Sequence, residues 1–418
     1  ILRNDSNNNM KRIIVGALVG AAVCCVMMSC GKSNNSEDKY AHLRSRLDSL
    51  ISANYRDDAP GVEVLVAVNG EVAYERYIGI ADMATGAKID SLTRMNIASC
   101  SKQMTAVSAL RLQEAGLLNL EDSVAKYFPK FKGDMWKKVR LKHLLSHSSG
   151  VLDLRPRADR EFTLHATDEQ SLEYMVTLDT LHFEPGTQYE YINPTFQVFY
   201  ALIQKLTGES FVTYQQKNIF DPCGMANCCY FDAATEMPNM AHGYVVNEDA
   251  VVGGVDSDTA KSRERVDQDY TDGAGVHWAE FDYGEETFFA TKADGGVYCT
   301  VRDLLKWENA LAQNKLISAE SLQQAYTKHT KVSGSQLCQY QNRPNTWYGF
   351  GWFIDDTPCR ELKIYHTGDN GGFQAYVGKY PASRVNVIML ENRNDLDRWQ
   401  MQLAIERILI EEGFVKGE

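Results

Sequence analysis

The sequence lacks a basic stripe. Its 418 residues carry 55 acidic side chains against 43 Lys and Arg, which gives a formal net charge of −12 at pH 7. Both signs are spread along the whole chain. Nucleic acids bind to concentrated positive surfaces, so this distribution excludes them as partners, and the net negative charge favours solubility.

Internal repeats and low-complexity tracts are also missing. The chain is 44% hydrophobic and 23% charged, which is ordinary for a soluble globular protein. This composition excludes disorder for most of the chain. The length predicts one large domain or two interleaved domains.

The marked apolar run, Ile13–Met28, lies near the N-terminus and is short for a membrane span. It follows Met10 and two basic residues, so residues 10–29 predict an export signal, and we expect residues 1–9 to be upstream sequence. Cys30 resembles the cysteine of a bacterial lipobox, which implies a diacylglycerol anchor and a membrane-tethered protein in the cell envelope. The alternative is a plain signal peptide. Polar residues 30–39 predict a flexible tether.

Zinc-type cysteine spacing is absent too. Of ten cysteines, three belong to the signal or anchor, and the seven that remain lie at positions 100, 223, 228, 229, 299, 338 and 359. An odd number outside the cytoplasm predicts at least one free thiol. His143 and His147 have the spacing of helical zinc ligands but lack the glutamate of H-E-x-x-H, so we expect no metal and no cofactor.

Patterns along the chain predict an α/β (α+β) fold. Residues 40–53 predict an amphipathic helix, and Asn69-Gly70 between apolar runs predicts a β-hairpin. Strand patterns return in the last part of the chain, before a helix at about 397–411. We therefore expect an antiparallel sheet in one domain, 40–98 plus 290–418, and a mainly helical domain at 99–289. Within the latter, acidic residues at about 247–286 predict a long irregular insertion.

The segment "NIASCSKQMTA" places Ser99 three residues before Lys102 at the start of a predicted helix. Residues three apart share a helix face, and the helix N-terminus supplies free N–H groups for an oxyanion. A partly desolvated lysine can accept the proton of a serine hydroxyl. The alternative is that Ser99 caps the helix and Lys102 is solvated.

Two further boxes follow in order, Tyr191-Ile192-Asn193 and His366-Thr367-Gly368. Singly, they could be a turn tyrosine with a helix cap and a solvent-facing strand histidine. Together with S-x-x-K, the sequence resembles the serine β-lactamase and D,D-peptidase superfamily in its class C branch. The resemblance extends from about 40 to 415 and includes the segments "HLLSHSSGV", "MAHGY" and "ADGGVYCTVRDLLKWENAL".

The resemblance implies a fold of the β-lactamase/transpeptidase type and a role for each box residue. Ser99 would attack a carbonyl, Lys102 would take or relay the proton, and Tyr191 would shuttle it. Asn193 would orient Lys102 and the substrate amide. The backbone N–H groups of Ser99 and Asp369 would form the oxyanion hole. The segment His366-Thr367-Gly368 would border the strand edge along which the substrate lies.

Two residues depart from the pattern of most such β-lactamases. His366 stands where lysine is usual, and because histidine titrates near neutrality we expect weaker binding of a substrate carboxylate. Within the family, this histidine resembles that of certain D,D-carboxypeptidases, D-amino-acid peptidases and esterases. Cys100 directly follows the serine; we interpret it as a packing residue from which thiol reagents could block the cleft.

The sequence therefore predicts an exported serine hydrolase that acts through a Ser99 acyl-enzyme on D-amino-acid or peptidoglycan-type peptides. One alternative is a β-lactamase or carboxylesterase with the same site. Another, of a different class, is a penicillin-binding-like envelope sensor with little turnover. The natural substrate, the disulfide pairing and the oligomeric state are left open by the sequence.

Overall fold

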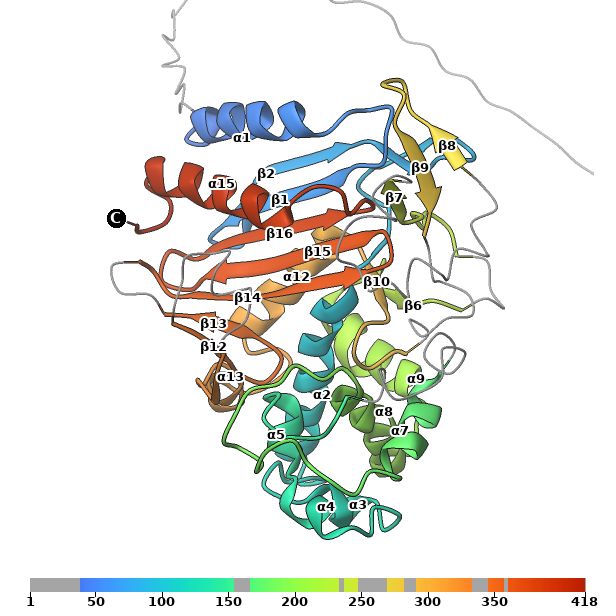
Figure 1. The fold of residues 1–418 in the computed structure, drawn as a ribbon. Helices are drawn as coiled ribbons and strands as arrows, with labels where there is room; N and C mark the ends of the chain where they lie inside the picture. The colour runs from blue at the N-terminus through green and yellow to red at the C-terminus, as the bar shows by residue number, and fades with distance from the viewer. Residues whose placement is uncertain are drawn as a thin grey trace, which may run out of the picture. The chain divides into compact units, whose positions relative to one another are not determined.

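Strands from both ends of the chain form one eight-stranded antiparallel sheet in the computed structural model (Figure 1). The model describes residues 38–153, 166–232, 237–246, 269–281, 291–332, 345–356 and 360–417, and Tyr40–Glu418 forms one compact unit. The predicted signal peptide, Cys30 and nearly all of the tether lie outside the described residues. No helix of the described part is long and apolar enough to cross a membrane.

The order of the sheet is β11-β12-β13-β14-β15-β16-β1-β2. Its first two strands in the chain, β1 and β2, pair as the predicted hairpin, and both turn residues, Asn69 and Gly70, have positive φ of 56° and 83°. β1 then pairs with β16, from Val62 opposite Glu391 to Val68 opposite Val385. The strands are β1 Val62–Val68, β2 Glu71–Ile78, β11 Thr330–Lys331, β12 Thr346–Tyr348, β13 Phe353–Asp355, β14 Lys363–Asn370, β15 Phe373–Tyr380 and β16 Val385–Glu391.

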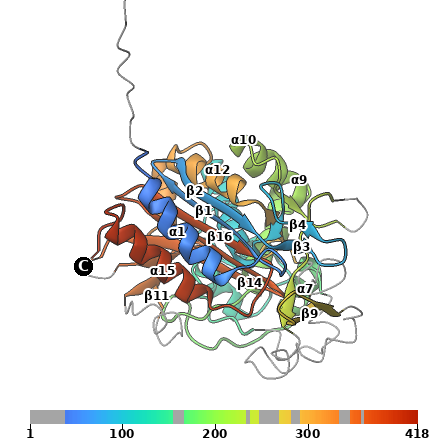
Figure 2. The same ribbon diagram turned by 90° about the horizontal axis from the view of Figure 1, so that it is seen from above.

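Helices cover both faces of this sheet, so the prediction of an antiparallel sheet flanked by helices is confirmed. α1 (Ala41–Asn54) and α15 (Arg398–Glu411) lie side by side over one face (Figure 2). Alternate residues of β1 divide between two cores: Val64 packs with α1 and α15, whereas Leu65 faces the second core. This two-sided burial explains why β1 is apolar almost throughout.

The second core joins the sheet to a group of helices from the middle of the chain (Figure 1). α12 packs against β1 and β16, and the long central helix α2 packs against α8. These helices are η1 Ala98–Ser101, α2 Lys102–Glu114, α3 Val124–Tyr127, α4 Asp134–Lys138, α5 Leu141–Leu145, α7 Asp168–Met175, α8 Pro194–Thr207, α9 Phe211–Gln215, η2 Gln216–Phe220, α10 Asp221–Cys223, α12 Val301–Ala312 and α13 Ala319–Ala325. The predicted domain boundaries themselves stay a prediction.

The expectation of irregular structure across 247–286 is wrong for 269–281. There, β8 and β9 form a hairpin, and β9 also pairs with β7. The carboxylate of Asp272 accepts backbone N–H bonds from Ala274 and Val276, and its second oxygen accepts from the buried Trp278 Nε1 at 3.0 Å. These strands are β7 Tyr244–Val246, β8 Asp269–Thr271 and β9 His277–Glu280; residues 247–268 and 282–286 lie outside the described part.

Two smaller sheets complete the described structure. β5 (Met95–Asn96), β10 (Val297–Cys299) and β6 (Cys229–Tyr230) lie beside the start of η1, and β3 (Ile80–Asp82) pairs with β4 (Ala87–Lys88). A disulfide joins Cys228 to Cys299. Cys100, Cys223 and Cys229 are free thiols, whereas Cys338 and Cys359 lie outside the described residues.

Candidate active site

Ser99 and Lys102 contact each other where η1 leads into α2. Lys102 Nζ lies 3.0 Å from Ser99 Oγ and donates a 2.7 Å hydrogen bond to the carbonyl oxygen of Asp294. Lys102 is fully buried, so it is not the solvated lysine of the alternative interpretation. The α-helix starts later than expected. Ser99 belongs to a 3-10 turn, which leads directly into α2 at Lys102.

The backbone before Ser99 is strained. Ala98 has a backbone φ of +45°, which residues other than glycine rarely adopt. Asn96 Oδ1 stabilises it by accepting the N–H of Ala98 at 2.7 Å, and Asn370 Nδ2 donates to the same oxygen at 3.2 Å. The first box is therefore fixed from two strands, β5 and β14.

The third box approaches the first through its glycine. A Cβ atom on Gly368 would lie 2.3 Å from the carbonyl oxygen of Ile97 and 2.9 Å from Ala98 Cβ, so only glycine fits here. β13 pairs with Lys363–Tyr365 and stops there. Beyond Tyr365, this same edge of β14 has no paired strand among the described residues, whereas the opposite edge pairs with β15 as far as Asn370. The unpaired edge from His366 onward is where the resemblance expects the substrate to lie.

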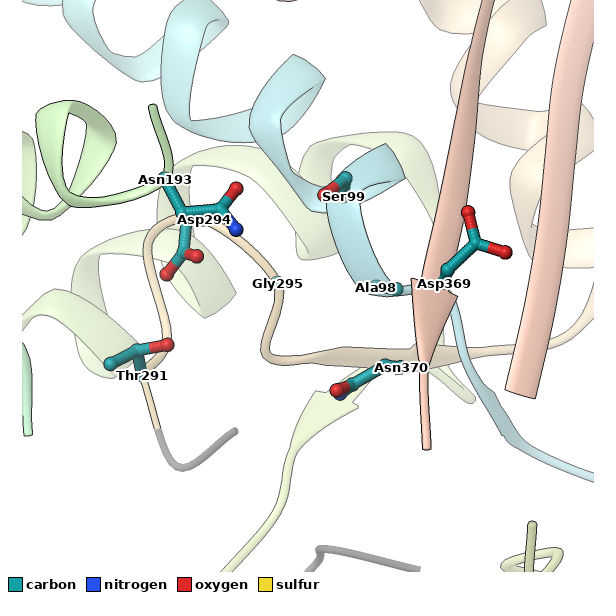
Figure 3. Close-up of a pocket in the computed structure, with 8 residues that line it drawn as sticks. All are labelled: Ala98, Ser99, Asn193, Thr291, Asp294, Gly295, Asp369 and Asn370. Carbon is teal, nitrogen blue, oxygen red and sulfur yellow. The ribbon is translucent and has the colours of Figure 1, made fainter. Parts of the chain in front are cut away.

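Figure 3 shows a pocket around Ser99 that brings residues of separate segments together. Ser99, Asn193 and Asp369 were predicted as site residues, and all three line it. The carboxylate of Asp369 points away from Ser99 (Figure 3), because Arg398 binds it at 2.8 and 3.1 Å. The complete lining consists of Ala98, Ser99, Asn193, Thr291, Asp294, Gly295, Asp369 and Asn370.

The second box lies against the buried lysine. Lys102 Nζ lies 5.1 Å from the ring centroid of Tyr191 and 5.5 Å from that of Phe196. Asn193 directly precedes α8 but its side chain makes no capping bond, and its Oδ1 is buried without a hydrogen-bond partner among the described residues. The helix-cap alternative for Asn193 therefore does not describe its side chain.

His366 is buried, and the expectation that it titrates near neutrality is wrong. Burial first, then the nearby Lys102, lowers the pKa of His366 to about 3. Its Nδ1 donates to the carbonyl oxygen of Thr367 at 2.6 Å, so its Nε2 accepts from Tyr348 Oη at 2.9 Å. His366 is therefore neutral at physiological pH and does not line the pocket around Ser99.

Two other sequence interpretations also change. Cys100 is 1% exposed and its Sγ bonds to the carbonyl oxygen of His366 at 3.4 Å, so thiol reagents in the cleft do not reach it without opening the structure. His143 Nδ1 accepts the N–H of Arg140 at the start of α5. Among the described residues, no group of three or more His, Cys, Asp or Glu is placed to bind a metal.

Sequence reasoning missed His147 and Asp294 as neighbours of the site. His147, in the segment "HLLSHSSGV", lies fully buried with its ring 4.1 Å from that of Tyr191. Its Nδ1 accepts the N–H of Ile192 at 3.2 Å, and its carbonyl oxygen accepts the N–H of Glu190 at 2.9 Å. Each residue belongs to a segment shared with the family, and His147 was also noticed for its spacing from His143, but neither signal placed it beside the nucleophile.

Known proteins resemble this chain in sequence. A model of the family described as beta-lactamase matches residues 47–407. Penicillin-binding protein 4* of Bacillus subtilis is 24% identical over 89% of this chain and 76% of its own length.

Solved structures show the same fold. The D-amino acid amidase of Ochrobactrum anthropi SV3 has a TM-score of 0.67 at 20% identity and covers 90% of this chain and 98% of its own. The D-alanine carboxypeptidase AmpC of Burkholderia cenocepacia has a TM-score of 0.65 at 21% identity, with 90% and 98% covered. The chain belongs to the β-lactamase family, whose members are serine hydrolases.

Proposed function

We propose that this protein hydrolyses an amide bond in D-amino-acid or peptidoglycan-type peptides through an acyl-enzyme on Ser99. The observation that carries the proposal is the 3.0 Å contact between Ser99 Oγ and the buried Lys102 Nζ. Lys102 Nζ donates to Asp294 O, so in its neutral form it can direct a lone pair at the serine hydroxyl.

Acylation would proceed in balanced steps. Ser99 Oγ bonds to the substrate carbonyl carbon while its proton passes to Lys102. The resulting oxyanion lies between the backbone N–H groups of Ser99 and Asp369. The C–N bond then breaks as the leaving amine takes the proton through Tyr191, whose ring lies beside Lys102. Water attacks the ester in the reverse sense and releases the acid.

The neutral, buried His366 supports a peptide or amide substrate over a carboxylate-bearing β-lactam. An ionised lysine at this position would attract a substrate carboxylate, whereas a histidine with a pKa of about 3 carries no charge at neutral pH. Two proteins of the same fold are named as a D-amino acid amidase and a D-alanine carboxypeptidase, which is in keeping with this preference.

Intact-protein mass spectrometry after incubation with a fluorescent penicillin tests the nucleophile, with a fragment starting at residue 36. We expect a persistent adduct in the parent protein and none in Ser99→Ala, whose melting curve should show an intact fold. An adduct that clears while hydrolysed drug accumulates would favour a β-lactamase instead. A lasting adduct without turnover of any D-amino-acid amide would favour the sensor. Full amidase activity in Ser99→Ala would refute the mechanism.

We also propose export and lipid anchoring at Cys30, on the sequence of residues 10–30 alone. Metabolic labelling with an alkyne fatty acid, followed by fractionation, tests this. The parent protein should carry the label in the membrane fraction, and Cys30→Ser should lose it. Equal labelling of both proteins would contradict the anchor.

A further inference from the structure

The charges that line the pocket are negative. Its ionisable lining side chains are two aspartates, Asp294 and Asp369. Arg398 neutralises Asp369 through a bidentate ion pair on the side away from Ser99. Asp294 has no comparable partner: its Oδ1 accepts a 3.1 Å hydrogen bond from Gln197 Nε2, a neutral amide, and within the described part no basic side chain forms an ion pair with it.

The side chain of Asp294 has little contact with water. Asp294 is only 4% exposed, and burial removes part of the hydration of a carboxylate. Its charge also acts on a neighbouring acid: burial first, and then the Asp294 carboxylate, raise the pKa of Asp168 to about 8. A cation that enters the pocket would relieve both effects.

The backbone around Asp294 is rigidly positioned. The carboxyl oxygens of Asp168 accept the N–H groups of Lys292 and Ala293 at 2.7 and 3.2 Å. Thr105 Oγ1 donates to the carbonyl oxygen of Ala293 at 2.7 Å, and Lys102 binds that of Asp294. The side chain of Asp294 is therefore presented at a fixed place opposite the nucleophile, which is what selective recognition requires.

A second unmet group belongs to the same pocket. Asn193 Oδ1 is buried without a hydrogen-bond partner among the described residues, and Asn193 and Asp294 both line the pocket (Figure 3). An ammonium group has three N–H donors and no acceptor. It therefore matches the combination of a carboxylate and an amide oxygen better than a hydroxyl or a second carboxylate does.

We propose that Asp294, assisted by Asn193 Oδ1, binds a protonated amine in the acyl half of the substrate. The inference rests on the proposed acyl-enzyme function and narrows its substrate class to amides of amino acids and peptides with a free amino terminus. The amine enters opposite the oxyanion hole, so the scissile carbonyl meets Ser99 while the leaving amine faces outward. A substrate with a carboxylate in the acyl half is repelled.

Three substrates that differ only in this charge test the proposal: D-alanine p-nitroanilide with a free amine, with an N-acetyl group and with an N-succinyl group. For the parent protein we expect kcat/KM to fall at least tenfold from the cationic to the neutral substrate, and further for the anionic one. In Asp294→Asn the ratio between cationic and neutral substrates should drop at least tenfold. Asp369→Asn is the comparison variant, because it also removes a lining carboxylate. Its rates can change on all three substrates together, since Asp369 belongs to the proposed oxyanion hole, but the ratio between the cationic and neutral substrates should stay within threefold of the parent ratio.

The possible outcomes distinguish amine recognition by Asp294 from the acyl-enzyme function of Ser99. Equal losses on all three substrates in Asp294→Asn would overturn amine recognition, since they would indicate a purely structural role. A parent protein that prefers the N-acetyl or N-succinyl compound would also overturn it, while turnover dependent on Ser99 would leave the acyl-enzyme function standing. Failure of all three substrates, together with no adduct at Ser99, would overturn both.

Discussion

His366 is a buried side chain that leaves the third box without a positive charge at neutral pH. Its two nitrogens are already occupied by Thr367 O and Tyr348 Oη, and Lys102 and Arg398 disfavour a further positive charge nearby. The neutral imidazole of His366 thus makes two hydrogen bonds at this position of the strand but carries no positive charge. His366 carries no charge at neutral pH because it is buried near Lys102 and Arg398.

We expect His366→Lys to destabilise the protein by about 3–5 kcal/mol, because it leaves a buried charge without a partner. Urea unfolding at pH 7 measures this. His366→Gln is the control, since it is neutral and can still bond to Tyr348, and it should lose less. A fully stable lysine variant that captures β-lactams better than the parent would show that the side chain reaches the pocket.

His147 acts on the second box through the backbone. It accepts the N–H of Ile192 on Nδ1 and that of Glu190 on its carbonyl oxygen, so it determines where Tyr191 and Asn193 lie. Its own φ of +49° is strained, which is typical of residues whose position is imposed by function.

Replacing His147 with Phe retains the aromatic packing but leaves the N–H of Ile192 unpaired. We expect kcat to fall about 10- to 100-fold with a smaller change in KM, because a misplacement of about 1 Å costs this much in rate. His147→Asn should recover part of kcat, since asparagine tolerates positive φ and offers an acceptor oxygen. Steady-state kinetics on an N-acetyl D-amino-acid anilide measures both; equal loss in the two variants would indicate a packing role only.

At the scale of elements, the site depends on how closely β14 approaches η1. The contact involves the carbonyl oxygen of Ile97 and leaves no space for a side chain at position 368. Arg398, at the start of α15, fixes the same strand end by binding Gly368 O at 2.8 Å as well as Asp369. Three elements from distant parts of the sequence thus determine one pocket wall.

Gly368→Ala should separate β14 from η1 and lower the acylation rate of Ser99 at least 100-fold, with loss of stability. Gly133→Ala is the matched control, because its Cβ would meet other atoms at an ordinary 3.7 Å. Penicillin-adduct formation over time, together with thermal melts, distinguishes the two variants. Normal acylation in Gly368→Ala would show that the two segments can move apart freely.

Elements with local signals were predictable from the sequence. The Asn69-Gly70 hairpin, α1 and α15 were all expected close to their observed bounds, because turn chemistry and apolar periodicity are local properties. The hairpin of β8 and β9 was missed because its order comes from the buried Trp278 and from pairing with β7, which the acidic composition conceals.

The three boxes were recognisable by order and spacing, but the neighbours that set their chemistry were not. Asp294 binds Lys102 across 192 positions of sequence, and no local pattern reports such a contact. The depressed pKa of His366 likewise depends on tertiary burial. Sequence therefore named the groups that are proposed to react but not the charge of their surroundings.

At the scale of the whole molecule, two buried acids have raised pKa values. Burial raises the pKa of Glu391 to about 7, although Tyr55 Oη donates a hydrogen bond to it. Asp168 is raised to about 8 for the same main reason. Both groups bind more protons in the folded than in the unfolded chain, so the stability that they contribute is complete below about pH 4 and is lost as pH rises to 7 and 8.

We therefore expect the free energy of unfolding to decrease between pH 6.5 and 8.5, with at most about 1.4 kcal/mol per pH unit from one group. This pH window lies above the ordinary histidine pKa. The buried histidines change the free energy of unfolding only below about pH 6.5, so they do not obscure the decrease. Glu391→Gln should flatten the decrease, because its side chain does not titrate. Urea unfolding at several pH values measures the slope; an identical slope in both proteins would assign the effect to other groups.

The pairing of β1 with β16 also affects the order in which the sheet can fold. β1 lies between β2 and β16, yet the strand that completes it, Val385–Glu391, lies far along the chain from β1, with Val68 paired to Val385. Until β16 pairs with β1, the hairpin presents an apolar, unpaired edge, and closing a loop of this length is slow. We expect a chain truncated before β16 to aggregate rather than to retain partial activity, because this edge of the hairpin then stays unpaired.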